Sequence, residues 1–282
     1  MTDALNLGIR QSEFTPVDDT FVVPYQRNPL VKGRGDFLSL LKDKLNMELS
    51  GKFNHRVALH GLGGVGKTQC ALEYVYANKA IYRRIYWISA VNQASMLSDY
   101  QKIAKLVRLA IPQEASPADI AEAVLAWLRG ERSWLVVIDN LDDIKVAQGL
   151  LPENAPGKHT LITTRNPRTQ GIPAEPLEVP LLTPNDSVDL LSMLSNVIAH
   201  DPDEEKQAYE IVEELGYLPL AIDLASAYVR DVTGNFSEYL QRYRINHKNS
   251  FFGSQMATVN TQTPLQLPGL CLLTPFKKTN ML

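Results

Sequence analysis

The fold is decided by the stretch RVALHGLGGVGKTQCALEYVY, residues 56–76, in which a glycine-rich segment joins an apolar run to a helical pattern. Its centre, GLGGVGKT at 61–68, matches G-x-x-x-x-G-K-[ST], the pattern of a phosphate-binding loop. Glycines allow the backbone to wrap closely and to turn its N–H groups toward anionic oxygens. The helix that follows adds the partial positive charge of its N-terminus beneath the phosphates. A strand before the loop and a helix after it are the context that this motif requires.

Two residues of the loop have specific expected roles. Lys67 is expected to reach the β- and γ-phosphates of a nucleotide, and the Thr68 hydroxyl to ligate Mg²⁺. The other residues of this segment expected around the nucleotide are Gly61, Gly63, Gly64, Val65, Gly66 and Gln69. The alternative is a glycine-rich turn that merely joins a strand to a helix.

A second group must hold the metal, and the run SWLVVIDNLDD at 133–143 supplies one. Asp139 stands at the C-terminal end of a predicted buried strand, the sheet edge at which α/β proteins bind ligands. We expect Asp139 to contact Mg²⁺ through water, although taken alone it could simply open a turn. Asn140 occupies the position at which fast P-loop ATPases carry a water-activating glutamate. Slow turnover is therefore expected, with Asp142 or Asp143 as alternative bases.

Arg165 follows the next apolar run, HTLITT at 159–164. An arginine at this place could sense the γ-phosphate through charge-assisted hydrogen bonds. The candidate catalytic residues are therefore Lys67, Asp139 and Arg165. On the residues alone, a solvated loop arginine explains Arg165 better.

Strand-like and helix-like segments alternate up to about residue 180. The predicted strands are RVALH at 56–60 and the apolar runs at 84–89, 133–139 and 159–164. Helical patterns cover 36–49, 67–78, 94–109 and 117–128. Asp36 and Ser116 are the expected N-caps of the first and last of these helices. Nearly continuous apolar strands separated by helices predict an α/β fold, a parallel P-loop NTPase sheet with helices on both faces.

The strand signals stop after LEVPLLTP at 177–184, and a helical subdomain is expected to follow. Its predicted helices are 186–198, 204–214, 219–229 and 236–243. From Ser250 onward the chain has three prolines and no acidic residue, so we expect a poorly ordered tail. The expected organisation is an N-terminal extension at 1–28, a P-loop nucleotide-binding domain at 29–180, a helical subdomain at 181–249 and an irregular tail at 250–282.

The composition is that of a globular protein, with 282 residues of which 45% are hydrophobic and 21% charged. It excludes collagen-like, disulfide-scaffold and fully disordered chains. Every apolar stretch falls far short of the ~20 residues of a membrane helix, so we expect no membrane partner. A net charge of -3 gives no reason to expect nucleic acid as a partner. Two cysteines make no disulfide framework, and a cytoplasmic location is expected.

Five segments of the chain together resemble one family. In order they are HGLGGVGKTQCALEYVY, RIYWISA, WLVVIDNLDD, LITTRNP and GYLPLAIDLASAYV. Their order and spacing are similar to those of NB-ARC domains, the nucleotide switches of STAND-class signalling ATPases, and look most like fungal NOD-like receptor proteins. The resemblance covers about residues 20–245. It implies ADP or ATP as the nucleotide, Asp139 as the Mg²⁺ aspartate and Arg165 as the γ-phosphate sensor.

The resemblance also gives meaning to two segments that carry no chemistry of their own. Pro219 corresponds to a family proline that packs near the nucleotide base from the helical subdomain. The run RNPLVKGRGDF at 27–37 resembles the element beside adenine, which implies base contacts at Val31, Gly33 and Arg34. Without the family, the run is a Pro/Gly loop and Pro219 is the first residue of a helix.

As a member of this family, the chain would be a switch in which ADP holds a compact state. ATP would favour opening and self-association, with slow Mg²⁺-dependent hydrolysis as the reset. Family members continue into a winged-helix unit and sensor repeats whose patterns are absent here, so the chain looks truncated. Two alternatives stay open. One is a P-loop metabolic enzyme, such as a small-molecule kinase or ATPase. The other is a truncated, non-switching remnant that associates with full-length relatives and interferes with them, or does nothing.

Overall fold

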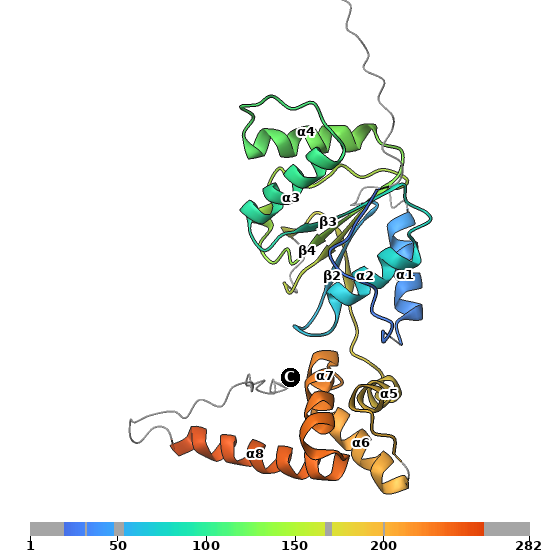
Figure 1. The fold of residues 1–282 in the computed structure, drawn as a ribbon, viewed down its shortest axis with the longest axis vertical. Helices are drawn as coiled ribbons and strands as arrows, with labels where there is room; N and C mark the ends of the chain where they lie inside the picture. The colour runs from blue at the N-terminus through green and yellow to red at the C-terminus, as the bar shows by residue number, and fades with distance from the viewer. Residues whose placement is uncertain (1–19, 32, 48–53, 167–170, 200, 257–282) are drawn as a thin grey trace, which may run out of the picture.

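The computed structural model describes residues 20–31, 33–47, 54–166, 171–199 and 201–256. Its centre is an all-parallel sheet of six strands in the order β1-β3-β4-β5-β2-β6. The strands are β1 (Thr20–Val22), β2 (Arg56–His60), β3 (Arg84–Ser89), β4 (Trp134–Asp139), β5 (Lys158–Thr163) and β6 (Glu175–Glu178). Helices cover both faces of the sheet (Figure 1), which confirms the predicted α/β fold.

The strand order determines which loops meet at the ligand-binding edge. Strand β5 lies between β2, which leads into the glycine-rich loop, and β4, which ends at Asp139. All three strands run in the same direction, so their carboxyl ends lie side by side at one edge of the sheet. In α/β sheets this is the edge at which ligands bind.

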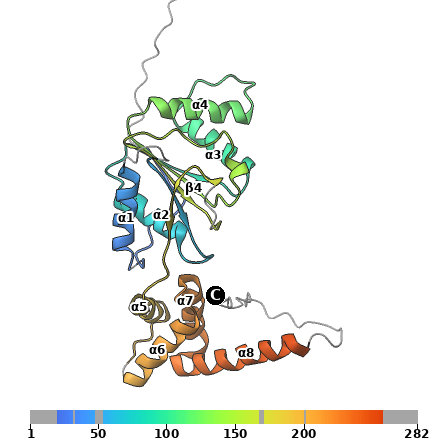
Figure 2. The same cartoon turned by 180° about the vertical axis from the view of Figure 1, so that it is seen from behind.

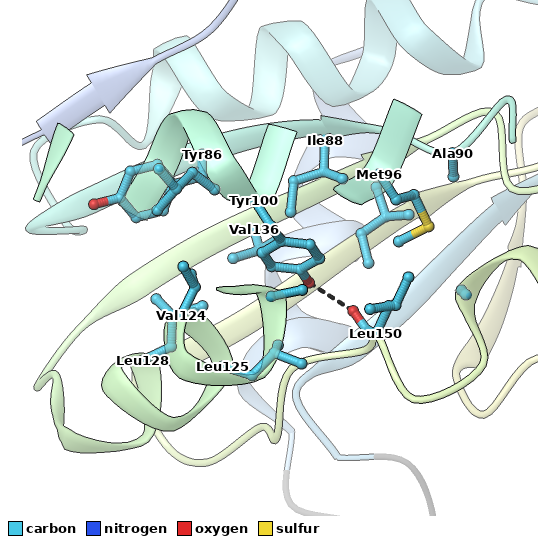
Figure 3. Close-up of a cluster of buried hydrophobic side chains, with 14 of the residues drawn as sticks. Tyr86, Ile88, Ala90, Met96, Tyr100, Val124, Leu125, Leu128, Val136 and Leu150 are labelled. Carbon is cyan, nitrogen blue, oxygen red and sulfur yellow. Dashed lines mark hydrogen bonds between the residues drawn. The ribbon is translucent and has the colours of Figure 1, made fainter. Parts of the chain in front are cut away.

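One face of the sheet packs against α3 (Gln93–Leu106) and α4 (Pro117–Gly130). Successive strand residues point to opposite faces, so Val136 of β4 lies in this cluster and Val137 lies in the other. Within the cluster, the buried Tyr100 hydroxyl donates to the carbonyl oxygen of Leu150 at 2.6 Å (Figure 3). The hydrogen bond satisfies a polar atom that is otherwise surrounded by apolar side chains.

The opposite face packs against α1 (Gly35–Asn46) and α2 (Lys67–Ala77). The expected N-cap of the first of these is wrong: Arg34 precedes the helix without a side-chain cap, and Asp36 lies in the first turn. A carboxylate there still favours the positive end of the helix. The expected cap of α4 is confirmed, because Ser116 and Asp119 form a reciprocal capping box.

Beyond the sheet, the chain forms a helical unit with its own core (Figures 1 and 2). Its elements are α5 (Pro184–Ser195), α6 (Pro202–Glu214), α7 (Pro219–Tyr228), the π-helical turn η3 (Val229–Thr233) and α8 (Phe236–Met256). Leu191, Ile211, Ile222 and Phe236 are buried at the centre of this unit. Within the described ranges, no helix combines the length and the apolar character needed to cross a membrane.

The predicted strands and helices are present, and apart from α8 their ends lie within three residues of the predicted positions. Strand β1 was not predicted, and β6 overlaps only the first two residues of the run at 177–184. Helix α8 continues past the predicted residue 243 to Met256, into the segment expected to be irregular. Residues 1–19 and 257–282, the rest of the expected extension and tail, lie outside the described residues.

A pair of buried histidines lies near the amino ends of β2 and β5. The rings of His55 and His159 stack with centroids 5.5 Å apart and an interplanar angle of 13°. His159 Nδ1 shares a 2.7 Å hydrogen bond with the Tyr82 hydroxyl, whereas its Nε2 has no partner among the described residues. Burial, with a smaller effect from His55, lowers the pKa of His159 to about 4. The folded protein therefore keeps this imidazole neutral.

We predict that the free energy of unfolding falls as the pH drops from about 6.5 to 4. In this interval the unfolded chain binds a proton at His159 and the folded chain does not, so about 1.4 kcal/mol is lost per pH unit. Urea unfolding of the wild type and of His159→Phe, followed from pH 8 to pH 4, measures the difference in slope. Parallel curves for the two proteins would contradict the prediction.

Candidate functional site

The loop between β2 and α2 has the left-handed backbone that its glycines favour. Gly61, Gly64 and Gly66 have φ angles of 138°, 80° and 95°, values that a side chain would strain. Gly66 is the N-cap of α2, so the helix begins at Lys67. The first N–H groups of α2 have no partner within the helix and are available to an anion at the loop.

Lys67 folds back over the loop that precedes it. Its ammonium donates to the carbonyl oxygens of Gly61 at 3.0 Å and Leu62 at 2.9 Å. The residue is 8% exposed, and burial of the charged group is the main cause that lowers its pKa. The carboxylates of Asp142 and Asp139 partly offset this effect. A phosphate bound by the loop would give this cation a stronger partner than two carbonyl groups.

Thr68 and Asp139, the two predicted metal ligands, are in direct contact. Thr68 Oγ1 donates to Asp139 Oδ1 at 2.9 Å, although the two residues belong to α2 and β4. Thr163, at the end of β5, donates to the same oxygen at 2.5 Å and accepts the N–H of Asn140 at 2.9 Å. Sequence reasoning missed Thr163, although a polar residue ending an apolar strand was a usable signal.

Arg165 is held by Asp142. Its backbone N–H donates to Asp142 Oδ1 at 2.6 Å, and its Nε donates to Oδ2 at 2.7 Å. Burial alone would raise the pKa of Asp142, but these hydrogen bonds and the arginine's charge hold it below its ordinary value. Asp143 instead caps the 3₁₀ helix η1 (Ile144–Ala147) by accepting the N–H of Lys145. Both candidate bases are therefore occupied by other contacts.

Residues 25–31 and 33–34 run from the side of α2 toward the loop, and we call them the strap. Arg34 is the last residue of the strap and is 5% exposed. Its guanidinium donates to the carbonyl oxygens of Pro180 at 2.7 Å and Val65 at 3.1 Å. Gly33 has a φ of 69°, and a Cβ there would lie 2.5 Å from Asp186 Cγ in α5. The strap therefore touches both the phosphate loop and the helical unit.

Helix α7 contacts the loop from the other side. Pro219 is its first residue, which suits a position whose N–H needs no helical partner. The next residue, Leu220, donates its backbone N–H to the Gly64 carbonyl oxygen at 3.3 Å. A Cβ on Gly64 would lie 2.8 Å from Leu220 Cβ. The absence of a side chain at Gly64 is what allows this approach.

A cavity of about 510 Å³ lies between the loop, the strap and the helical unit. The predicted site residues that line it are Val31, Arg34, Gly63, Gly64, Val65, Gly66, Lys67, Thr68, Gln69, Arg165 and Pro219. Three others do not line it: Gly61 packs near Val179, Gly33 packs on Asp186, and Asp139 lies buried against Thr68. The structure therefore brings the predicted phosphate and base segments to one cavity.

Sequence reasoning missed the face of α5 that closes this cavity. Lining residues without a predicted role include Asn28, Leu30, Leu182, Asp186, Leu190, Met193, Leu194 and Asp223. The helical pattern of α5 indicated an apolar face. It could not distinguish side chains of the helical core from side chains that line a cavity.

A family comparison agrees with this geometry. The model of the NB-ARC domain matches residues 38–201, more than half of the chain. The chain belongs to the NB-ARC family. It is thus a P-loop NTPase of the STAND class, and nucleotide binding is a property of that family.

Two curated proteins are similar to this NB-ARC chain. A nucleotide-binding leucine-rich repeat (NLR)-like protein of Hyaloscypha variabilis is 31% identical over 247 residues, which cover 79% of this chain and 24% of that protein. The regulatory protein AfsR of Streptomyces coelicolor is 26% identical over 69% of this chain and 20% of its own length. The chain therefore spans a quarter or less of the length of these relatives.

Solved structures share the fold at low sequence identity. A Walker-type ATPase of Pyrococcus abyssi superposes with a TM-score of 0.53 and 15% identity, covering 84% of this chain and 78% of that one. Cdc6p from Pyrobaculum aerophilum has a TM-score of 0.51 and 19% identity, with coverage of 76% and 66%. These likenesses support the P-loop ATPase fold of the NB-ARC chain.

We predict that Gly64→Ala destabilises the nucleotide-free protein more than Gly66→Ala does. Both place a Cβ on a left-handed backbone, at a cost of about 1–2 kcal/mol. Only at Gly64 does that Cβ collide with Leu220, which adds about 1–3 kcal/mol because α7 must shift. Denaturant unfolding gives both free energies. Equal losses would show that the loop and α7 are not in contact in solution.

Proposed function

We propose that this NB-ARC chain is a signalling switch that binds ADP or ATP with Mg²⁺ in the cavity between the sheet and the helical unit. The observation that carries the proposal is the composition of that cavity: phosphate-binding groups from the loop face side chains of α5 and α7. A nucleotide in this place would contact both units at once. Its occupancy would therefore bias how the two units pack.

The phosphate end of the cavity is suited to a nucleoside diphosphate or triphosphate. Lys67 and the N–H groups at the start of α2 supply positive charge, and Arg165 stands at the edge of the same cavity. At the other end, Leu30 and Val31 of the strap and Leu190 and Met193 of α5 provide apolar surface for a base. The proposal therefore has the phosphates at the loop and the base between the strap and α5, a division that this lining supports.

Thr68 and Asp139 are the residues that would hold Mg²⁺. Both present oxygen atoms, the ligand type that this ion prefers, and the two oxygens are 2.9 Å apart. The described residues contain no group of three or more His, Cys, Asp and Glu side chains able to hold a metal ion, so phosphate oxygens would complete the site. The ion would neutralise charge between the β- and γ-phosphates.

The contact between Gly64 and Leu220 is the proposed link from nucleotide to packing. It joins the loop that binds phosphate to the first turn of α7. A γ-phosphate that alters the loop at Gly64 would favour an arrangement in which α7 has moved. ADP and ATP can then shift the equilibrium by the difference in their affinities for the two arrangements.

Hydrolysis is proposed to be slow and to serve as the reset. Asn140 has a φ of 63° and directs its backbone N–H to Thr163, while the Asp142 carboxylate is engaged by Arg165. Neither position presents a free carboxylate to activate water. The open arrangement is proposed to self-associate, or to associate with longer relatives, and to act in the cytoplasm.

The proposal predicts that ADP binds in the nanomolar to micromolar range and that Lys67→Ala weakens this affinity by roughly 10- to 100-fold. The ammonium supplies charge-assisted hydrogen bonds to the phosphates, which alanine cannot make. Isothermal titration calorimetry with Mg²⁺ measures both affinities. Lys102→Ala, on the exposed surface of α3, is the matched control and should bind like the wild type. Absence of ADP and ATP binding by the wild type would overturn the proposal.

The proposed metal site predicts a loss of Mg²⁺ dependence in Asp139→Asn. In the wild type, Mg²⁺ should tighten ATP binding by about tenfold relative to EDTA, and the amide should reduce this ratio toward one because it lacks the charge. Asp143→Asn, in the cap of η1, changes the same group outside the site and should keep the ratio. An unchanged ratio in Asp139→Asn would remove Asp139 from the metal site.

A further inference from the structure

Glu73 is a buried carboxylate on α2 that the proposed nucleotide contacts do not use. It follows Lys67 by six residues and is 5% exposed. Its Oε2 accepts a hydrogen bond from Arg27 Nε at 3.1 Å, and its Oε1 has no partner within the described part of the chain. Burying a carboxylate that is only half satisfied costs free energy. The position therefore calls for a role that an apolar residue could not fill.

The partner of Glu73 belongs to the strap. Around Arg27 the strap is fixed to the α/β unit, because Tyr76 Oη donates to the Tyr25 carbonyl oxygen at 2.9 Å. The Tyr25 ring also meets Trp87 edge-on, with centroids 5.6 Å apart. At its far end, Arg34 ties the strap to the phosphate loop. Through its ion pair with Arg27, Glu73 thus fixes the strap to α2 near the amino end of the strap.

The residues between these anchors form part of the cavity wall. Asn28, Leu30 and Val31 all line the cavity, and the Asn28 side chain stabilises a turn by accepting the Leu30 N–H at 2.9 Å. Arg27 immediately precedes this turn. The ion pair therefore sets where the turn begins relative to α2, and with it the apolar surface opposite α5.

We propose that Glu73 is a positioning residue for the nucleotide base: through Arg27 it holds the strap against α2, so that Leu30 and Val31 form the wall of the base subsite. The inference rests on the proposed nucleotide binding. Glu73 touches no ligand in this scheme. Its loss should weaken binding of ligands that reach the strap and spare ligands that need only the phosphate loop.

The test compares ADP with inorganic pyrophosphate, both with Mg²⁺, by titration calorimetry. Pyrophosphate occupies the loop at Lys67 and has no base. Glu73→Gln keeps the shape of the side chain and removes its charge, and we expect ADP affinity to fall roughly threefold to fivefold, as loss of one partly exposed ion pair allows. Pyrophosphate affinity should stay within twofold of the wild type.

Arg27 gives an independent variant, because its own side chain is 58% exposed and its truncation leaves no gap in the core. Arg27→Ala should reproduce the selective loss of ADP affinity, and Arg27→Lys should restore most of it because it keeps the cation. The double variant Glu73→Gln/Arg27→Ala should bind ADP as the worse single variant does, since both remove the same interaction. Glu131→Gln breaks the ion pair between Glu131 and Arg84, the first residue of β3. It is the matched control for a loss of stability alone and should leave the affinities for ADP and pyrophosphate unchanged.

Each outcome decides the proposal. Equal losses for ADP and pyrophosphate in Glu73→Gln and Arg27→Ala would mean that the pair supports the phosphate loop rather than the strap. Unchanged ADP affinity in both variants would mean that the strap is held without the pair. Either result overturns the role of Glu73 and leaves nucleotide binding intact. Failure of the wild type to bind ADP, by contrast, overturns the proposed function and this inference with it.

Discussion

One buried carboxylate holds the candidate nucleotide site together. Asp139 is 3% exposed, and its Oδ1 accepts hydrogen bonds from Thr68 at 2.9 Å and Thr163 at 2.5 Å. These residues stand at the end of β4, the start of α2 and the end of β5. Hydrogen bonds to a charged group are stronger than neutral ones, and burial removes competition from water. The loop and the two strand ends are thereby kept in register, and the positions of Lys67 and Arg165 depend on that register.

The helical unit is fitted onto this framework at two glycines. Leu220 packs against Gly64, and Asp186 packs against Gly33, in each case where a Cβ atom would otherwise lie. Both glycines have positive φ, so each supplies a backbone conformation and a vacant Cβ position together. The cavity exists because the two units touch at these points and remain apart between them. Its shape is accordingly sensitive to small changes in the loop or in the strap.

The sequence was sufficient for features that depend on local chemistry. The loop at 61–68 and the strand that ends at Asp139 have patterns complete within a few residues, and the structure places both as predicted. Thr163 and the pairing of Arg165 with Asp142 depend on β4 and β5 being neighbours, which no local pattern encodes. The lining by Leu190 and Met193 depends on how the helical unit is oriented. Strand β1 has only three residues, too short for a periodic signal.

The two outer strands of the sheet constrain how copies of the chain could assemble. Edge strands with unpaired backbone groups can pair with another sheet, but β1 offers three residues and β6 four. Pro176 within β6 has no N–H to donate, and Glu175 and Glu178 place charge at both ends of that strand. Continuous sheet formation across two molecules is therefore disfavoured at both borders. Among the described residues, the helices and loops therefore offer more surface for contacts between copies than the borders of the sheet do.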